Sequence, residues 1–221
     1  MLEFIQTSYF ILLYVIILVV AIATYHRYFD TVLKFFPIYI AYTIFTELLG
    51  YFIITYEDIS FFEDPKYAWY NVIIFNIHSV LVFGYFFWVY FKIVKRKIYK
   101  KVILYFGFTV LLGYILNCFM ENPFYSGLYQ ADTLASLFYI VVALMYFSGR
   151  NWRFERHNFM FWITLGLLIF HLIFPFLNLT GFLKPKIWVE YHFRDILKLT
   201  IMASYSMYLI GLLLGRRRAF R

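Results

Sequence analysis

Long apolar runs separated by short polar loops make up most of this chain. The clearest run extends from Ala68 to Phe91, contains no charged residue and is followed by the densest basic stretch of the chain, Lys92–Lys101. A helix of about 20 apolar residues crosses the roughly 30 Å hydrocarbon core of a bilayer. The run therefore predicts a membrane-spanning helix.

Other runs of the same kind predict further spans on both sides of this one. The expected spans, seven in all, are residues 8–24, 35–55, 68–91, 102–119, 133–147, 158–177 and 187–215. We expect Glu121–Pro123 to end the fourth span and Asn178–Gly181 to turn the chain after the sixth. The last run is longer than a bilayer requires, so its first turns are expected to project or to tilt. The pattern predicts an all-α integral membrane protein with a single seven-helix transmembrane domain over residues 1–221.

The distribution of charge among the loops predicts the orientation of the helices. Loops rich in Lys and Arg stay on the cytoplasmic side of a membrane. Basic loops alternate with acidic ones such as Glu57–Asp64, in the order expected for an outside N-terminus and a cytoplasmic C-terminus. The residues expected to make cytoplasmic contacts are Lys92, Lys95, Arg96, Lys97, Lys100, Lys101, Arg216, Arg217 and Arg218. The predicted location is a bacterial inner (cytoplasmic) membrane, with the lipid bilayer and a cytoplasmic or membrane protein as partners.

The composition agrees with a membrane protein. Hydrophobic residues make up 64% and charged residues 14% of the chain, whereas about 25% of the residues of a soluble domain are charged. The net charge of +8 lies in loops that flank spans, which indicates contact with anionic lipid rather than nucleic-acid binding. Aromatic residues, at 25%, are too many for the membrane interfaces alone and must pack helix against helix. The lone Cys118 excludes an internal disulfide and a thiolate metal cluster.

Polar and ionisable side chains inside the predicted spans gather toward the outer side of the membrane. Such groups are costly in lipid and are therefore candidates for a functional site. We predict an outward-facing polar cavity for water, a ligand or an ion, lined by Glu47, Asn71, Asn76, His78, Asn117, His171, Asp195 and Lys198. Asp132 begins the fifth span on the same side. A structural interpretation stays open, with Glu47 protonated or hydrogen-bonded to a tyrosine, the other groups bonded between helices, and Asp195 paired with Lys198 or Arg194.

Histidines and a lysine in the predicted spans suggest two cofactors, zinc and retinal. His78, His171 and His192, with Asp195 and Glu47 nearby, would suit a zinc ion that activates water in a membrane-embedded lipid hydrolase or transferase. Alkaline ceramidases use His, Asp and Ser in this way, but the paired HxxxH of their last helix is missing here. Lys198 invites comparison with microbial rhodopsins, in which the retinal-binding lysine follows an aspartate by four positions. In that family the lysine faces an acidic counterion on helix three. Here Asp195 precedes it by three and the third span contains no acid, so retinal is not expected.

Several segments of the second to seventh spans have a residue pattern like that of one group of membrane proteins. These segments are Phe45–Tyr51, Tyr70–Asn76, Phe83–Phe87, Phe161–His171 and Tyr205–Gly211. In them the chain resembles small seven-span proteins that are common in Bacteroidota. No settled activity is attached to that group, so the resemblance implies a location in the cell envelope rather than a function.

The sequence favours a non-enzymatic sensor or receptor-like subunit, for which no catalytic residue is predicted. Such a subunit would bind a small ligand or lipid in the outer cavity and pass the change to a cytoplasmic partner through the basic loops. The hypothesis rests on the polar cluster on one side of the membrane and the basic surface on the other. Two alternatives stay open. One is the metal-dependent lipid enzyme, and the other is a structural or partner-stabilising subunit in which the polar residues only hold helices together.

Overall fold

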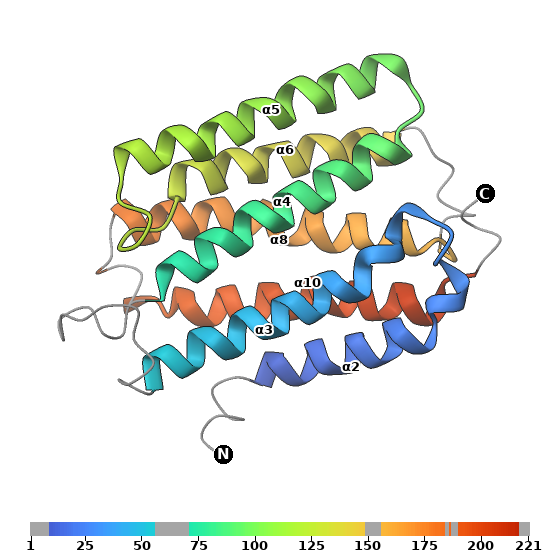
Figure 1. Ribbon diagram of the computed structural model, residues 1–221, viewed down its shortest axis with the longest axis horizontal. Helices are drawn as coiled ribbons and strands as arrows, with labels where there is room; N and C mark the ends of the chain where they lie inside the picture. The colour runs from blue at the N-terminus through green and yellow to red at the C-terminus, as the bar shows by residue number, and fades with distance from the viewer. Residues whose placement is uncertain (1–8, 56–70, 149–155, 184–185, 187–189, 217–221) are drawn as a thin grey trace.

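Long helices run side by side along one axis of the computed structural model, which describes residues 9–55, 71–148, 156–183, 186 and 190–216 (Figure 1). Seven α-helices lie in these ranges. They are α2 (Tyr9–Ala23), α3 (Phe36–Thr55), α4 (Val72–Ile93), α5 (Lys97–Met120), α6 (Tyr129–Ser148), α8 (Phe159–Leu183) and α10 (Phe193–Leu214). Two short 3-10 helices, η1 (Tyr25–Arg27) and η2 (Val32–Phe35), connect α2 to α3. The prediction of an all-α protein is confirmed.

The lengths and composition of these helices suit a bilayer. The described residues contain six helices that are long and apolar enough to cross a membrane, while α2 is apolar but only 15 residues long. At 1.5 Å per residue, the described part of α2 extends for about 22 Å. The chain is therefore a polytopic membrane protein. The inside–outside orientation stays a prediction.

The helices form a closed ring in chain order. Each of α2, α3, α4, α5, α6, α8 and α10 packs against the next, and α10 packs back against α2. The most extensive contact joins α8 to α10, followed by the contact of α6 with α8. Two glycines permit the close approach of α8 and α10: a Cβ at Gly166 would lie 2.6 Å from the Ser204 carbonyl oxygen, and one at Gly211 2.6 Å from Cβ of Trp162. Larger residues at these positions would force the two helices apart.

Aromatic side chains fill the interior of the ring. Rings from different helices meet at centroid distances of 4.3 Å for Tyr14 and Tyr205 and 5.2 Å for Phe83 and Phe138. Further buried rings are those of Tyr39, Phe86, Tyr90, Tyr139 and Tyr208. This packing explains the high aromatic content, because large aromatic side chains fill the interior where the helices of the ring face one another.

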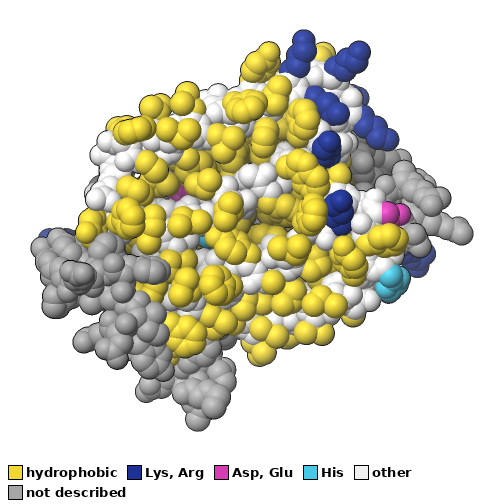
Figure 2. All heavy atoms as spheres, in the orientation of Figure 1, with side chains coloured by type: hydrophobic (Ala, Val, Ile, Leu, Met, Phe, Trp, Pro, Cys, Tyr) yellow, Lys and Arg dark blue, Asp and Glu magenta, His cyan; other side chains and the backbone are white. Residues whose placement is uncertain are grey.

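The surface divides into an apolar middle and a basic end. Hydrophobic side chains cover the middle of the face shown in Figure 2, and Lys and Arg gather at one end of it. Exposed apolar residues lie on several helices, as contact with lipid requires, and include Leu12, Ile38, Phe45, Leu112 and Leu172. We call the end where α4 passes into α5 and where α10 ends the basic end; its described bases are Arg27, Lys34, Lys92, Lys95, Arg96, Lys97, Lys100, Lys101, Arg156 and Arg216.

Two predicted helix boundaries are wrong. α8 continues through Pro175 to Leu183, so Asn178–Gly181 forms no turn. Its polar side chains are satisfied without one, since Asn178 Nδ2 donates to the Tyr129 carbonyl oxygen at 3.1 Å. α10 begins at Phe193 rather than at residue 187 because His192 has φ 50° and ψ 38°, a left-handed conformation that a right-handed helix does not contain. The predicted stop after the fourth span agrees with the end of α5 at Met120.

Candidate functional site

The interior polar residues fall into two clusters on different sides of α4. The Glu47 cluster comprises Tyr14, Tyr39, Thr43, Glu47, His78 and Tyr205 and joins α2, α3, α4 and α10. The Asp132 cluster comprises Ser79, Tyr114, Asp132, Ser136 and His171 and joins α4, α5, α6 and α8. Of the residues predicted to line one cavity, Glu47 and His78 lie in the first cluster and His171 lies in the second. The cavity itself stays a prediction.

Glu47 is a half-buried carboxylic acid in the middle of α3. It lies near enough to Tyr14 on α2 and Tyr205 on α10 for its charge to act on both hydroxyl groups. No hydrogen bond to the carboxylate is found in the part of the chain that the structure describes. Glu47 therefore presents an acidic group, flanked by two phenols, that no described side chain neutralises.

Hydroxyl groups link the rest of this cluster. The Tyr39 and Tyr205 oxygens are 2.8 Å apart, and Thr43 also bonds to Tyr205 through its side chain. Thr43 Oγ1 lies 3.2 Å from Nε2 of His78, whose ring stacks on Tyr42 at 5.5 Å. His78 is thus held between α3 and α4 by one hydrogen bond and one ring contact, which is the arrangement of a structural histidine.

Asp132 has several internal partners. The Tyr114 hydroxyl donates to Oδ1 of Asp132 at 2.8 Å, and Ser79 bonds to the same carboxyl group. Ser136 Oγ donates to the Asp132 backbone oxygen at 2.9 Å and lies 3.0 Å from Nδ1 of His171. The His171 ring stacks on Tyr139 with centroids 4.2 Å apart. This cluster ties four helices together through satisfied polar groups.

The predicted asparagines bind mostly to backbone groups. Asn71 Nδ2 donates to the Gly50 oxygen at 3.0 Å, across from α4 to α3. Asn117 Oδ1 accepts from the Ala131 amide at 3.2 Å, while its Nδ2 has no partner among the described residues. Asn76 makes three contacts with the segment between α5 and α6, to the Pro123 oxygen (2.7 Å), the Ser126 oxygen (3.0 Å) and the Leu128 amide (3.2 Å). These bonds position a loop and a helix pair.

The charged residues at the start of α10 lie away from both clusters. Asp195 and His192 are exposed, with 67% and 82% of their side-chain surfaces accessible, and Nδ1 of His192 is 3.9 Å from Oδ2 of Asp195. Lys198 is half-exposed, and no ion pair between Asp195 and Lys198 or Arg194 is found among the described residues. Asp195 therefore lies at the surface beside a histidine, and its role in the predicted cavity stays a prediction.

The structure does not assemble the predicted zinc ligands. His78 is bonded to α3, His171 to α6, and His192 is exposed at the opposite end of the bundle from the basic end. Within the described ranges no group of three or more His, Cys, Asp or Glu side chains could hold a metal ion.

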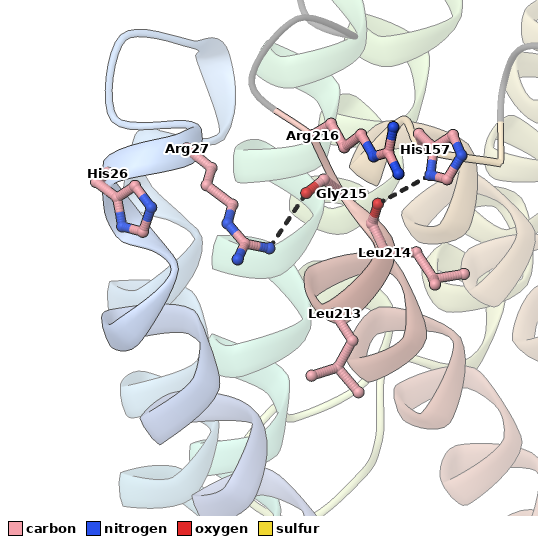
Figure 3. Close-up of a pocket in the computed structure, with 7 residues that line it drawn as sticks. All are labelled: His26, Arg27, His157, Leu213, Leu214, Gly215 and Arg216. Atoms are coloured by element: carbon pink, nitrogen blue, oxygen red, sulfur yellow. Dashed lines mark hydrogen bonds between the residues drawn. The ribbon is translucent and has the colours of Figure 1, made fainter.

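A hollow of about 510 Å³ lies at the basic end rather than at the predicted outer side. Its lining residues are His26, Arg27, His157, Leu213, Leu214, Gly215 and Arg216 (Figure 3). Sequence reasoning missed this hollow because its residues come from three distant segments. It also did not indicate which of the 22 tyrosines lie beside Glu47.

Comparisons with protein-family models, with curated proteins and with solved structures find no match. The class of the protein therefore rests on the chain itself: it is a polytopic membrane protein with apolar helices of spanning length. The resemblance to the small seven-span proteins stays a prediction.

Proposed function

We propose that this protein is a non-enzymatic, sensor or receptor-like membrane subunit that binds a small ligand next to Glu47. The observation that carries the proposal is the acidic group of Glu47, which lies in an apolar helix without a hydrogen bond from any described residue. Ionisable groups inside a membrane are costly and are retained where they serve a function. A ligand that donates hydrogen bonds or carries positive charge would compensate this cost.

The surroundings of Glu47 favour a ligand with both polar and aromatic or apolar parts. Tyr14 and Tyr205 supply hydroxyl groups beside the carboxylate, and their rings are in contact at 4.3 Å. A site formed by a few convergent polar groups among apolar walls is typical of small-molecule binding. The ligand contacts proposed from the structure are therefore Glu47, Tyr14 and Tyr205, and the predicted asparagines and histidines support the helices around them.

The position of the cluster also supports a route for signalling. Glu47 and the two tyrosines belong to α3, α2 and α10, and α10 ends at the basic end, where Gly215 contacts Arg27. A ligand that changes the packing of α10 against α2 would therefore displace groups about 15 Å away along the helix axis, given 1.5 Å per residue from Tyr205 to Gly215. With the N-terminus outside and the C-terminus in the cytoplasm, as the charge pattern predicts, the basic end would meet a cytoplasmic partner at an inner membrane.

A structural or partner-stabilising subunit is the second candidate. The observation in its favour is the internal satisfaction of Asn71, Asn76, His78 and His171, which use their polar atoms to join helices. Under this alternative Glu47 would be a protonated acid and the interior would bind no ligand. No feature of the described residues favours the metal-dependent lipid enzyme.

Native mass spectrometry of the intact protein, gently extracted from its own membrane, tests the proposal. We compare the natural chain with Glu47→Gln, which keeps the shape of the side chain and removes its charge. Glu190→Gln is the matched control, because Glu190 is an exposed acid outside the interior. A small molecule bound to the natural chain and to the Glu190 variant, but lost from the Glu47 variant, is the expected result. An empty natural chain, or equal occupancy in all three proteins, would favour the structural subunit.

A further inference from the structure

The hollow at the basic end brings together three segments that are remote in the sequence. η1 contributes His26 and Arg27, the residue pair before α8 contributes His157, and the end of α10 contributes Gly215 and Arg216. Figure 3 shows Arg27 approaching Gly215 from η1, while His157 approaches Leu214 from the other side. The hollow is therefore a product of the tertiary structure and not of one basic run.

Backbone contacts fix the shape of this hollow. Arg27 Nη1 donates to the Gly215 oxygen at 3.3 Å and His157 Nδ1 donates to the Leu214 oxygen at 3.2 Å. The Arg216 amide donates to the His157 oxygen at 2.9 Å. Cations near a helix C-terminus stabilise its free carbonyl groups, so one role of Arg27 is to cap α10. Burial raises the pKa of Tyr28, which stays a neutral phenol and donates to the Ala21 oxygen at 2.6 Å beside η1.

Capping leaves most of the hydrogen-bonding capacity of the hollow unused. A guanidinium group carries five N–H donors, and the structure shows one of those of Arg27 in use. The Arg216 side chain makes no hydrogen bond or ion pair with any described residue. All four ionisable residues of the lining are Arg or His, and the lining contains no acid. The hollow thus concentrates positive charge that no carboxylate of its own lining balances, and such a site attracts anions.

We propose that this hollow binds a phosphate group, carried by an anionic lipid headgroup or by a soluble phosphate. Guanidinium groups bind phosphate oxygens through paired, charge-assisted hydrogen bonds, which suits Arg27 and Arg216 on a common hollow. The exposed side chains of Leu213 and Leu214 adjoin the two arginines and continue along α10. This arrangement of charged hollow and apolar flank matches a phosphate with acyl chains attached. The inference does not depend on a ligand at Glu47.

Lipid binding to the full chain in neutral detergent tests the inference. The probes are a short-chain phosphatidylglycerol and inorganic phosphate, each titrated against the natural chain and against Arg27→Gln/Arg216→Gln, with binding read by native mass spectrometry. Lys97→Gln/Lys101→Gln is the matched control, because it removes the same charge from exposed lysines of the basic end outside the hollow. Each lost charge-assisted bond contributes enough that we expect affinity to fall at least about tenfold in the arginine variant. The lysine variant should retain the affinity of the natural chain.

The two probes identify the source of the phosphate. Arginine-dependent binding of phosphatidylglycerol, without competition by inorganic phosphate, assigns the hollow to a lipid headgroup; arginine-dependent binding of both probes assigns it to phosphate in general. Equal losses in the arginine and lysine variants, or no binding of either probe by the natural chain, overturn the inference. Because Arg27 also caps α10, Arg216→Gln alone is measured as well. It should weaken binding at an unchanged unfolding temperature, and unchanged binding in this variant would also refute the proposal.

Discussion

Replacement of Asn76 by alanine should destabilise this protein more than the loss of any other predicted site asparagine. Asn76 is buried and holds three backbone groups of the segment between α5 and α6. Alanine removes all three bonds and leaves two carbonyl groups and one amide without this partner. At about 0.6–1 kcal/mol for each hydrogen bond in a membrane protein, the loss amounts to about 2–3 kcal/mol of unfolding free energy.

Asn71→Ala is the matched control for this prediction. Asn71 is half-buried and makes one side-chain hydrogen bond, to the Gly50 oxygen. The same reasoning gives a loss of about 0.6–1 kcal/mol, so Asn76→Ala should cost about three times as much.

Reversible unfolding in mixed micelles, with a rising fraction of sodium dodecyl sulfate, measures both free energies. Circular dichroism follows the helix content, and the two variants are compared with the natural chain at the same lipid-to-detergent ratio. Equal and small losses would refute the structural role assigned to Asn76. They would return Asn76 to the set of ligand contacts predicted from the sequence, where its removal would affect binding more than folding.

Two further experiments test the packing and the orientation. Gly166→Ala should lower the free energy of unfolding by about 1–3 kcal/mol, because the added Cβ would lie 2.6 Å from a backbone oxygen of α10. Gly84→Ala is the control, because an added Cβ there meets open space and should be tolerated. Equal effects of the two substitutions in the same unfolding assay would contradict the close contact. For the orientation, a cysteine at Lys101 in a Cys118→Ser background should react with a membrane-impermeant maleimide only after the membrane is opened, and a cysteine at Glu190 should react in intact cells. The reverse labelling pattern would invert the predicted topology.

The two interior clusters differ in whether their ionisable groups have hydrogen-bond partners. Asp132 and His171 are surrounded by partners, so their polar atoms contribute to helix association. Glu47 has neighbours but no described hydrogen-bond donor, and this difference distinguishes a candidate binding residue from a structural one. Polarity inside a span is therefore a guide to a site only when the partners of each group are known.

Most of the secondary structure could be predicted from the sequence. The bilayer requires long apolar segments, and the charge-free run Ala68–Phe91 accordingly coincides with most of α4 (Val72–Ile93). The two wrong predictions concern the end of the sixth span, where the helix continues through polar residues, and the start of the seventh, where one residue departs from helical geometry. α8 extends past the predicted end at Leu177 because Asn178 bonds within the bundle, and α10 starts late because His192 is left-handed.

The sequence by itself determined the class of the protein, its apolar helices and the basic character of one end, because each of these depends on composition along a single segment. The tertiary structure alone decided which side chains meet. The predicted spans are apolar on nearly all faces, so their periodicity did not indicate which face is buried. Only the ring of helices places Tyr205 beside Tyr39 and joins Arg27 to Gly215 across 188 positions of the chain. Those contacts define the candidate sites, whereas the presence of polar residues in the sequence does not.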